Sequence, residues 1–165
     1  MAQRASHAGV MDITLFPQTR DGYQAFDMAL DNAALASGGD LRNAVILSLF
    51  CDRRAEDDDA LPDNTGSRRG WWGDTVTGRR IGSRLWLLSR EKQLREVVNR
   101  AREYAQEAVA WLVDDSVVDD IEVEAAIVAA GVLGLAVRVF RPGAAPETYR
   151  FGYLWQDATL QGIAA

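Results

Sequence analysis

The strongest constraint on the fold of this chain is a change of hydrophobic period near residue 115. Upstream, the apolar residues of segment 91–112 recur every three or four positions, which predicts one amphipathic helix: they are Leu94, Val97, Val98, Ala101, Tyr104, Ala105, Ala108 and Leu112. Downstream, apolar and polar residues alternate, as in a half-buried strand. Helices followed by a run of strands predict an α+β fold.

Three strands are expected after residue 120. In the first, Ile121, Val123, Ala125 and Ile127 alternate with Glu122 and Glu124. The second runs through Leu135, Val137 and Val139, and Arg141-Pro142-Gly143 turns the chain into a third strand over 147–155. The aromatic residues of this third strand share one face, which must be covered by the helices or by a partner. We therefore expect two or three helices packed on a C-terminal antiparallel β-meander, an α/β layer sandwich.

The first half of the chain is expected to hold fewer regular elements. Residues 10–16 alternate as a short strand, which Pro17 and Asp21-Gly22 should end. A helix should run from Leu41 to Cys51 and be buried on most sides, and Ser83 should cap a short helix that ends at Leu88. We expect a single domain over 10–155, with a disordered N-terminus at 1–9 and a C-terminal tail at 156–165.

Residues 52–82 form the least regular part of the sequence. They contain one proline, four glycines before Ile81 and many charges, so they should fold as a long loop. A loop of about 30 residues in a compact domain usually carries function or a docking surface.

Two adjacent tryptophans, Trp71 and Trp72, are the most informative local feature of this loop. Each ring buries up to about 200 Å² when covered, so both should find a contact. We expect one ring to close the core beneath the loop and the other to contact a neighbouring subunit or, alternatively, a sugar. Three arginine pairs, Arg53-Arg54, Arg68-Arg69 and Arg79-Arg80, also bracket the loop. Because many acidic residues lie near them, ion pairs explain the arginines better than a phosphate-binding patch does.

Composition disfavours several functional classes. The net charge of −6 and pI of about 4.8 argue against binding to nucleic acid or to an anionic membrane. Cys51 and His7 are the only residues of their types, so thiolate zinc sites and histidine triads are not expected. The acidic run 56–59 lacks the spacing of a calcium loop, and the glycines match no phosphate-binding motif. We expect no enzyme activity, no cofactor and no metal.

The sequence contains no apolar run that approaches the roughly 20 residues of a membrane helix. The N-terminus also lacks the apolar segment of a signal peptide. We expect a cytosolic protein when it is made, with any export depending on another apparatus.

The segment Gly66–Arg90, GSRRGWWGDTVTGRRIGSRLWLLSR, resembles the signature of the Mu-like phage tail baseplate wedge family. The likeness combines the core Arg69–Asp74 with Gly82–Leu88 and with a long helix that carries Ala110-Trp111-Leu112, and it extends over about residues 10–155. The family is more distantly similar to the sheath-initiator wedge proteins, whose Glu-Pro-Arg motif would fall near residues 52–54. This chain lacks the proline, so we transfer no role to those residues.

The resemblance implies a structural protein of a contractile tail, located in the virion baseplate and assembled in the host cytoplasm. Its expected role is to join the baseplate to the first sheath ring by strand pairing. Expected partners are other wedge proteins, the tail sheath subunit and tail tube or hub proteins, with no nucleic acid and no membrane. The expected protein-contact residues are Arg69, Trp71, Trp72 and Asp74 in the loop, and Tyr149, Arg150, Phe151, Tyr153 and Leu154 in the last strand.

Two alternatives to a structural role remain open at this point. A lysozyme-like enzyme acting on peptidoglycan would need a pair of carboxylates, for which Glu122 and Glu124 are the candidates. A glycan-binding module would use Trp71 and Trp72 as a stacking platform.

Overall fold

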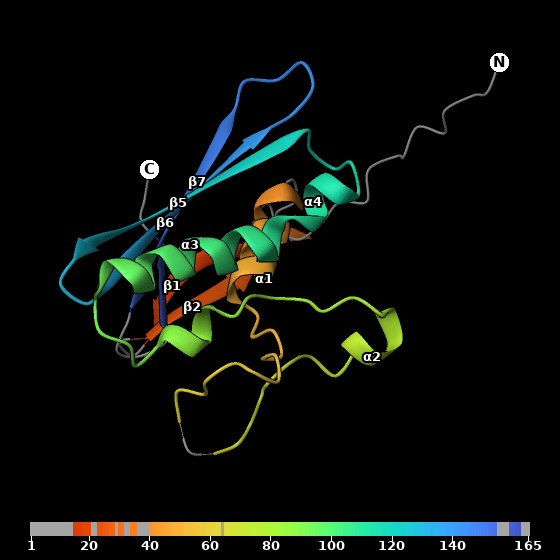
Figure 1. Cartoon of the computed structure of the whole chain (residues 1–165). Coiled ribbons are helices and arrows are strands. Elements are labelled where there is room, and N and C mark those ends of the chain that lie inside the picture. Colours follow the sequence, from red (N-terminus) through yellow and green to blue (C-terminus); the bar gives the residue numbers. More distant parts are fainter. Residues whose placement is uncertain are drawn as a thin grey trace.

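The computed structural model has two layers, a C-terminal antiparallel sheet and helices that cross one of its faces (Figure 1). It describes residues 15–20, 23–28, 30–31, 34–35, 40–63, 65–154 and 159–162, with side chains described for 41–63, 65–75 and 78–153. The two main helices are α1 (Asp40–Phe50) and α3 (Arg95–Val109). The expected α+β layer architecture is confirmed.

The sheet contains the expected meander and one further strand. Its strands are β5 (Asp120–Ala129), β6 (Val132–Phe140), β7 (Glu147–Leu154) and β8 (Thr159–Gly162), in the order β5-β6-β7-β8. The strand β8 was not expected, and it pairs with β7 from Phe151↔Gly162 to Leu154↔Thr159. Over residues 151–154, β7 is therefore an internal strand.

The alternating residues of the sheet build the core against the helices. Their inward side chains are almost fully buried: Ile121, Val123, Leu133, Leu135, Val137, Val139, Phe151 and Tyr153. Phe50 of α1 packs edge-on against Phe151 at 5.2 Å between ring centroids, so a helix covers the aromatic face of β7. Ile127 departs from the pattern and is 43% exposed, at a register shift between Ile127 and Ala129.

The long helix is shorter than its periodicity predicts. Leu94 has an extended backbone and a side chain that is 54% exposed, so α3 begins only at Arg95. The separate short helix α4 (Trp111–Asp114) follows α3 and carries the buried Leu112. Between the loop and α3, Leu85–Leu88 forms the 3₁₀ helix η1, whose four side chains are all buried.

The helix expected near Leu41 is present as α1, although its burial is incomplete. Val45, Ile46 and Leu49 face the core, whereas Leu47 is 48% exposed. None of the helices in the described residues is long and apolar enough to cross a membrane.

An N-terminal hairpin forms where only one short strand was expected. Strands β1 (Leu15–Arg20) and β2 (Tyr23–Met28) pair from Leu15↔Met28 to Arg20↔Tyr23, and β3 (Leu30–Asp31) pairs with β4 (Ala34–Leu35). The expectation that Pro17 ends a strand is wrong, since Pro17 pairs with Phe26. Among the described strands β1 has a single neighbour, and a strand paired on one side tolerates the missing N–H of proline. Residues 1–14, which include most of the expected strand 10–16, lie outside the described part, as does Trp155.

Candidate functional site: the tryptophan loop and the sheet edge

The two ends of the loop 52–82 meet at one point. The Ser83 N–H donates to the Cys51 carbonyl at 2.9 Å, and the Arg53 N–H donates to the Ser83 carbonyl at 3.0 Å. Between them Gly82 has φ of +96°, and a Cβ there would lie 2.2 Å from the Cys51 oxygen. Only glycine fits this crossing. The loop therefore leaves and rejoins the body at the same place and projects away from the sheet (Figure 1).

A second closure divides the loop into two lobes. The Ala55 N–H donates to the Arg68 carbonyl at 2.9 Å, and the Arg68 guanidinium donates to the carbonyls of Glu56 and Asp57. We call residues 56–67 the acidic lobe and residues 71–81 the tryptophan lobe. Main-chain and arginine hydrogen bonds give this segment a defined shape despite its lack of regular structure.

Ion pairs are confirmed for four arginines of the expected pairs, Arg53, Arg69, Arg79 and Arg80, whereas Arg68 donates to main-chain carbonyls. Arg84 bridges Asp59 at 3.1 Å and Glu107 of α3 at 3.0 Å, and Arg53 also reaches Glu107 at 3.2 Å. Partial burial opposes the charge of Arg84, but its hydrogen bonds and the two carboxylates outweigh burial and raise its pKa. Two further ion pairs, Arg69–Asp52 and Arg80–Glu56, lie within the loop, and Arg79–Asp115 joins the loop to the end of α4.

Neither Trp71 nor Trp72 closes the core, so that expectation is wrong. Trp71 is 42% exposed and Trp72 is 79% exposed, with their ring centroids 5.3 Å apart. The tryptophan that does lie beneath the loop is Trp86 of η1, which is 3% exposed and donates its Nε1–H to the Arg53 carbonyl at 2.8 Å. The Arg69 guanidinium lies 4.4 Å above the Trp86 ring. The burial of Trp86 was not expected, although the continuous apolar run Leu85–Leu88 was a sequence signal for it.

Local contacts hold the two exposed tryptophans in place. Gly73 is buried, and a Cβ at this position would meet the Trp71 ring at 2.3 Å. The next residue begins the short helix α2 (Asp74–Thr77), and the Asp74 carboxylate accepts the Ile81 N–H at 3.1 Å. Asp74 thus closes the tryptophan lobe, while Trp72 presents most of its ring to solvent.

The five residues expected to make contacts from the last strand have different surroundings. Phe151 and Tyr153 lie in the core, and Tyr149 is partly buried with its hydroxyl donating to Glu147 at 2.6 Å. Arg150 is exposed on the outer face of the sheet. The Leu154 backbone pairs with Val132 and Thr159, and its side chain lies outside the described part. The side chains of Phe151 and Tyr153 are therefore buried inside the protein. At these two positions a partner could contact only the main chain.

The Tyr153 hydroxyl is buried and finds no hydrogen-bond partner among the described residues. Burial raises the pKa of Tyr153 to about 12, because the phenolate would lose its hydration there.

The carboxylates considered for glycoside hydrolysis lie on the outer face of the sheet. Glu122 and Glu124 are exposed neighbours on one side of β5, and Glu122 is 3.6 Å from Arg138. They border a polar hollow of about 370 Å³ together with Arg138 and Arg150. Hydrolysis needs two carboxylates that flank a bond from opposite sides, which two residues of one strand face do not provide. The geometry gives no support to the enzyme hypothesis.

The surroundings of Cys51 do not favour a nucleophilic thiol. Its side chain is partly buried, and burial followed by the charge of Asp52 raises the pKa of the thiol. A thiol held protonated is a poor nucleophile. Within the described ranges no group of three His, Cys, Asp or Glu side chains is placed to hold a metal ion.

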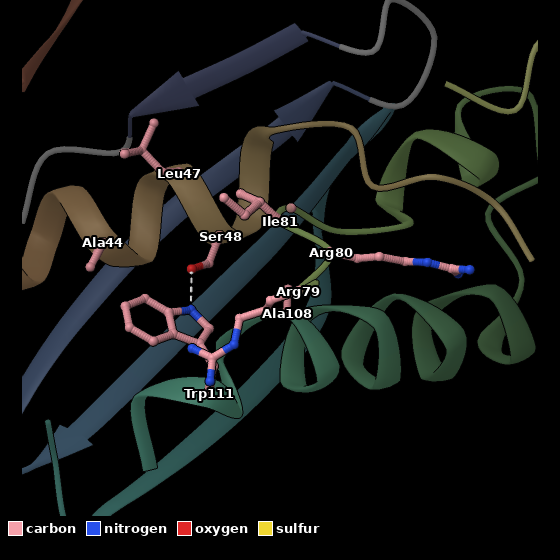
Figure 2. A pocket seen from close by; sticks show the side chains of 9 residues that line it. Ala44, Leu47, Ser48, Arg79, Arg80, Ile81, Ala108 and Trp111 are labelled. Carbon is pink, nitrogen blue, oxygen red and sulfur yellow. Dashed lines mark hydrogen bonds between the residues drawn. The ribbon is translucent and has the colours of Figure 1, made fainter. Parts of the chain in front are cut away.

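An apolar pocket of about 360 Å³ opens between α1, α4 and the end of the tryptophan lobe (Figure 2). It is lined by Ala44, Leu47, Ser48, Arg79, Arg80, Ile81, Gly82, Ala108 and Trp111. The Trp111 Nε1–H donates to the Ser48 hydroxyl at 2.8 Å. The indole N–H therefore already has a partner, and the ring lines the pocket as an apolar group. Sequence reasoning missed this pocket, although apolar residues on all sides of α1 were a signal that one side would remain open.

Comparison with known proteins identifies the family of the chain. Residues 41–146 match the family described as phage protein GP46. The chain is 45% identical over 125 residues to the baseplate protein gp46 of Escherichia phage Mu, covering 76% of this chain and 86% of that protein. It is 39% identical over 130 residues to the Mu-like prophage FluMu protein gp46 of Haemophilus influenzae, covering 78% and 89%. No solved structure matches the chain. The resemblance seen in residues 66–90 is confirmed, and the chain belongs to the phage protein GP46 family.

Proposed function

We propose that this chain is a structural, non-enzymatic component of a contractile-tail baseplate. The observation that carries the proposal is its 45% identity to the baseplate protein of phage Mu over 86% of that protein. The long loop agrees with this role, because its arginines and carboxylates are used to hold its own shape. It offers a preformed surface for neighbouring proteins.

The tryptophan lobe is the proposed contact with another baseplate protein. Trp72 is 79% exposed, and Gly73 and Asp74 hold the lobe that presents it, so docking costs little conformational entropy. Tryptophan is enriched among the few residues that dominate binding energies, which are often worth about 2 kcal/mol or more each. The contact should therefore depend on Trp72 more than on the surrounding loop.

The C-terminal sheet is the proposed contact with the first sheath ring. Strand addition needs unpaired main-chain groups, and at the β7–β8 end of the sheet these lie along 147–150 of β7 and along the outer side of β8. Residues 151–154 are already paired on both sides. The proposed docking edge is therefore shifted from β7 alone to β8 and the first half of β7.

A cryo-EM reconstruction of the assembled tail tip tests both parts of the proposal. We expect the chain in the baseplate, with a sheath strand hydrogen-bonded to β8 or to residues 147–150. A chain that is present but touches the sheath only through other elements would remove strand pairing. Absence of the chain from the particle would reject the baseplate role itself.

A further inference from the structure

We infer that the pocket between α1 and α4 binds a basic amphipathic segment of another protein. This site is separate from the exposed tryptophans and from the sheet edge. The inference rests on the proposed function in one respect: it places the partner in the assembled particle.

The lining of the pocket suits an apolar side chain of a ligand. This lining is mainly apolar and includes Leu47, Ile81 and Trp111, and the indole N–H of Trp111 is already bonded to Ser48. The volume of about 360 Å³ accommodates one or two large side chains. Leu47 is 48% exposed at this opening, so a ligand that covers it gains apolar burial.

Arg79 and Arg80 are the charged residues that line the pocket, and two aspartates lie next to it at the end of α4. Asp114 and Asp115 follow Trp111 by three and four positions, a spacing that places side chains on one side of a helical turn. Arg79 lies 5.8 Å from the Trp111 ring and binds Asp115 through two bonds of 2.6 and 2.8 Å. Arg80 contributes its stem, but its guanidinium points away from the other lining side chains, toward Glu56 (Figure 2). Asp115 thus pairs with Arg79, and the charge of Asp114 adds a second carboxylate that acts on the same guanidinium.

The acidic residues continue along the chain beyond α4. Residues 111–120 contain four aspartates and no lysine or arginine. Within this stretch Val113 is 36% exposed and Val117 is 48% exposed, so apolar and acidic groups alternate on the surface. The Arg79–Asp115 pair is itself about half exposed, and such surface pairs are weak enough for a partner cation to share the carboxylate. The complementary ligand carries a large apolar residue with lysine or arginine within one helical turn of it.

Binding of synthetic peptides to the purified full chain tests this chemistry without any particle. The probes are a short amphipathic leucine–lysine peptide and its leucine–glutamate counterpart, followed by intrinsic tryptophan fluorescence. We expect the lysine peptide to bind at least about tenfold more tightly. Leu47→Gln and Asp114→Asn should each weaken it several-fold.

Matched variants separate the pocket from a general attraction of a cation to an acidic protein. Leu94→Gln changes a leucine of similar exposure on another element, and Asp57→Asn removes a carboxylate of the acidic lobe. Both should bind the lysine peptide like the unmodified chain. Equal binding of the two peptides, or equal effects of all four substitutions, would overturn the inference.

Photocrosslinking in assembled particles identifies the occupant. With p-benzoylphenylalanine in place of Leu47, we expect a product with a different protein whose crosslinked peptide holds a lysine or arginine within four residues. The same group in place of Leu94 should not give this product. A product with a second copy of this chain or with its own residues 1–14 would overturn the inference. Particles that lack the chain would reject the proposed function, while the peptide result would still decide this pocket.

Discussion

The sheet and the long loop of this protein reach a defined structure by different means. In β5 and β6, side chains alternate between the core and solvent, and apolar burial determines the register. In residues 52–82, few side chains are buried, and the path depends on glycine crossings, arginine hydrogen bonds and ion pairs. A strand pattern is visible in the sequence because it is periodic, whereas contacts between residues far apart in the chain leave no period.

Truncation of a core residue should have the largest effect on stability. Leu135 is 1% exposed, so Leu135→Ala should lower the free energy of unfolding by about 3 to 5 kcal/mol through lost burial and the cavity left behind. Ile127→Ala, at the 43% exposed end of the same sheet, should cost about 1 kcal/mol or less. Urea denaturation measures both, and similar losses would contradict the division of the sheet into a buried face and an open end.

The loop should be most sensitive at its glycine crossing. Gly82→Ala places a Cβ against the Cys51 carbonyl at positive φ, and we expect a loss of about 2 to 3 kcal/mol. Gly78→Ala is the control, since Gly78 also has positive φ but has open space around it, and should cost about 1 kcal/mol. Equal losses in thermal or chemical unfolding would show that close contact at the loop base contributes nothing.

Tyr153 provides a pH-dependent test of burial in the sheet. Its folded-state pKa is raised from 10.0 to about 12, so the unfolded chain loses this proton first as pH rises. Its contribution to stability should be complete below pH 10 and should fall by up to about 2 kcal/mol between pH 10 and 12. Tyr153→Phe should remove this part of the alkaline loss and, because the hydroxyl has no described partner, should be neutral or slightly stabilising at pH 7. A parallel decline in both proteins above pH 10 would contradict burial as the cause.

Substitution of the exposed tryptophan should have the smallest effect on stability. Trp72→Ala should change the free energy of unfolding by no more than about 0.5 kcal/mol, because the ring is 79% exposed. The proposed function expects the same substitution to reduce incorporation into baseplates, measured by quantitative mass spectrometry of purified particles. Trp86→Ala, by contrast, should destabilise the chain by about 3 kcal/mol, because this ring is buried. Normal incorporation of the Trp72 variant would remove the tryptophan lobe from the interface.

The long helix shows how far periodicity alone extends. Its buried positions Val97, Ala101, Ala105 and Ala108 were all expected from their spacing. Its start was placed too early, because Leu94 continues the apolar period but belongs to an extended backbone segment. Periodicity indicates which side chains lie on the same face of a helix. It does not indicate at which residue the helical hydrogen bonding begins.

The sequence by itself determined the class of the fold, the inward faces of β5, β6 and β7, the presence of α1 and α3 and, through residues 66–90, the family. These properties depend on side-chain chemistry repeated at short range or on a local motif. Only the tertiary structure decided which tryptophan is buried, which glycine closes the loop, that β8 pairs with half of β7, and that an apolar pocket opens between α1 and α4. Each of these depends on segments distant in the chain meeting in space, where packing and hydrogen bonding choose among residues of the same type.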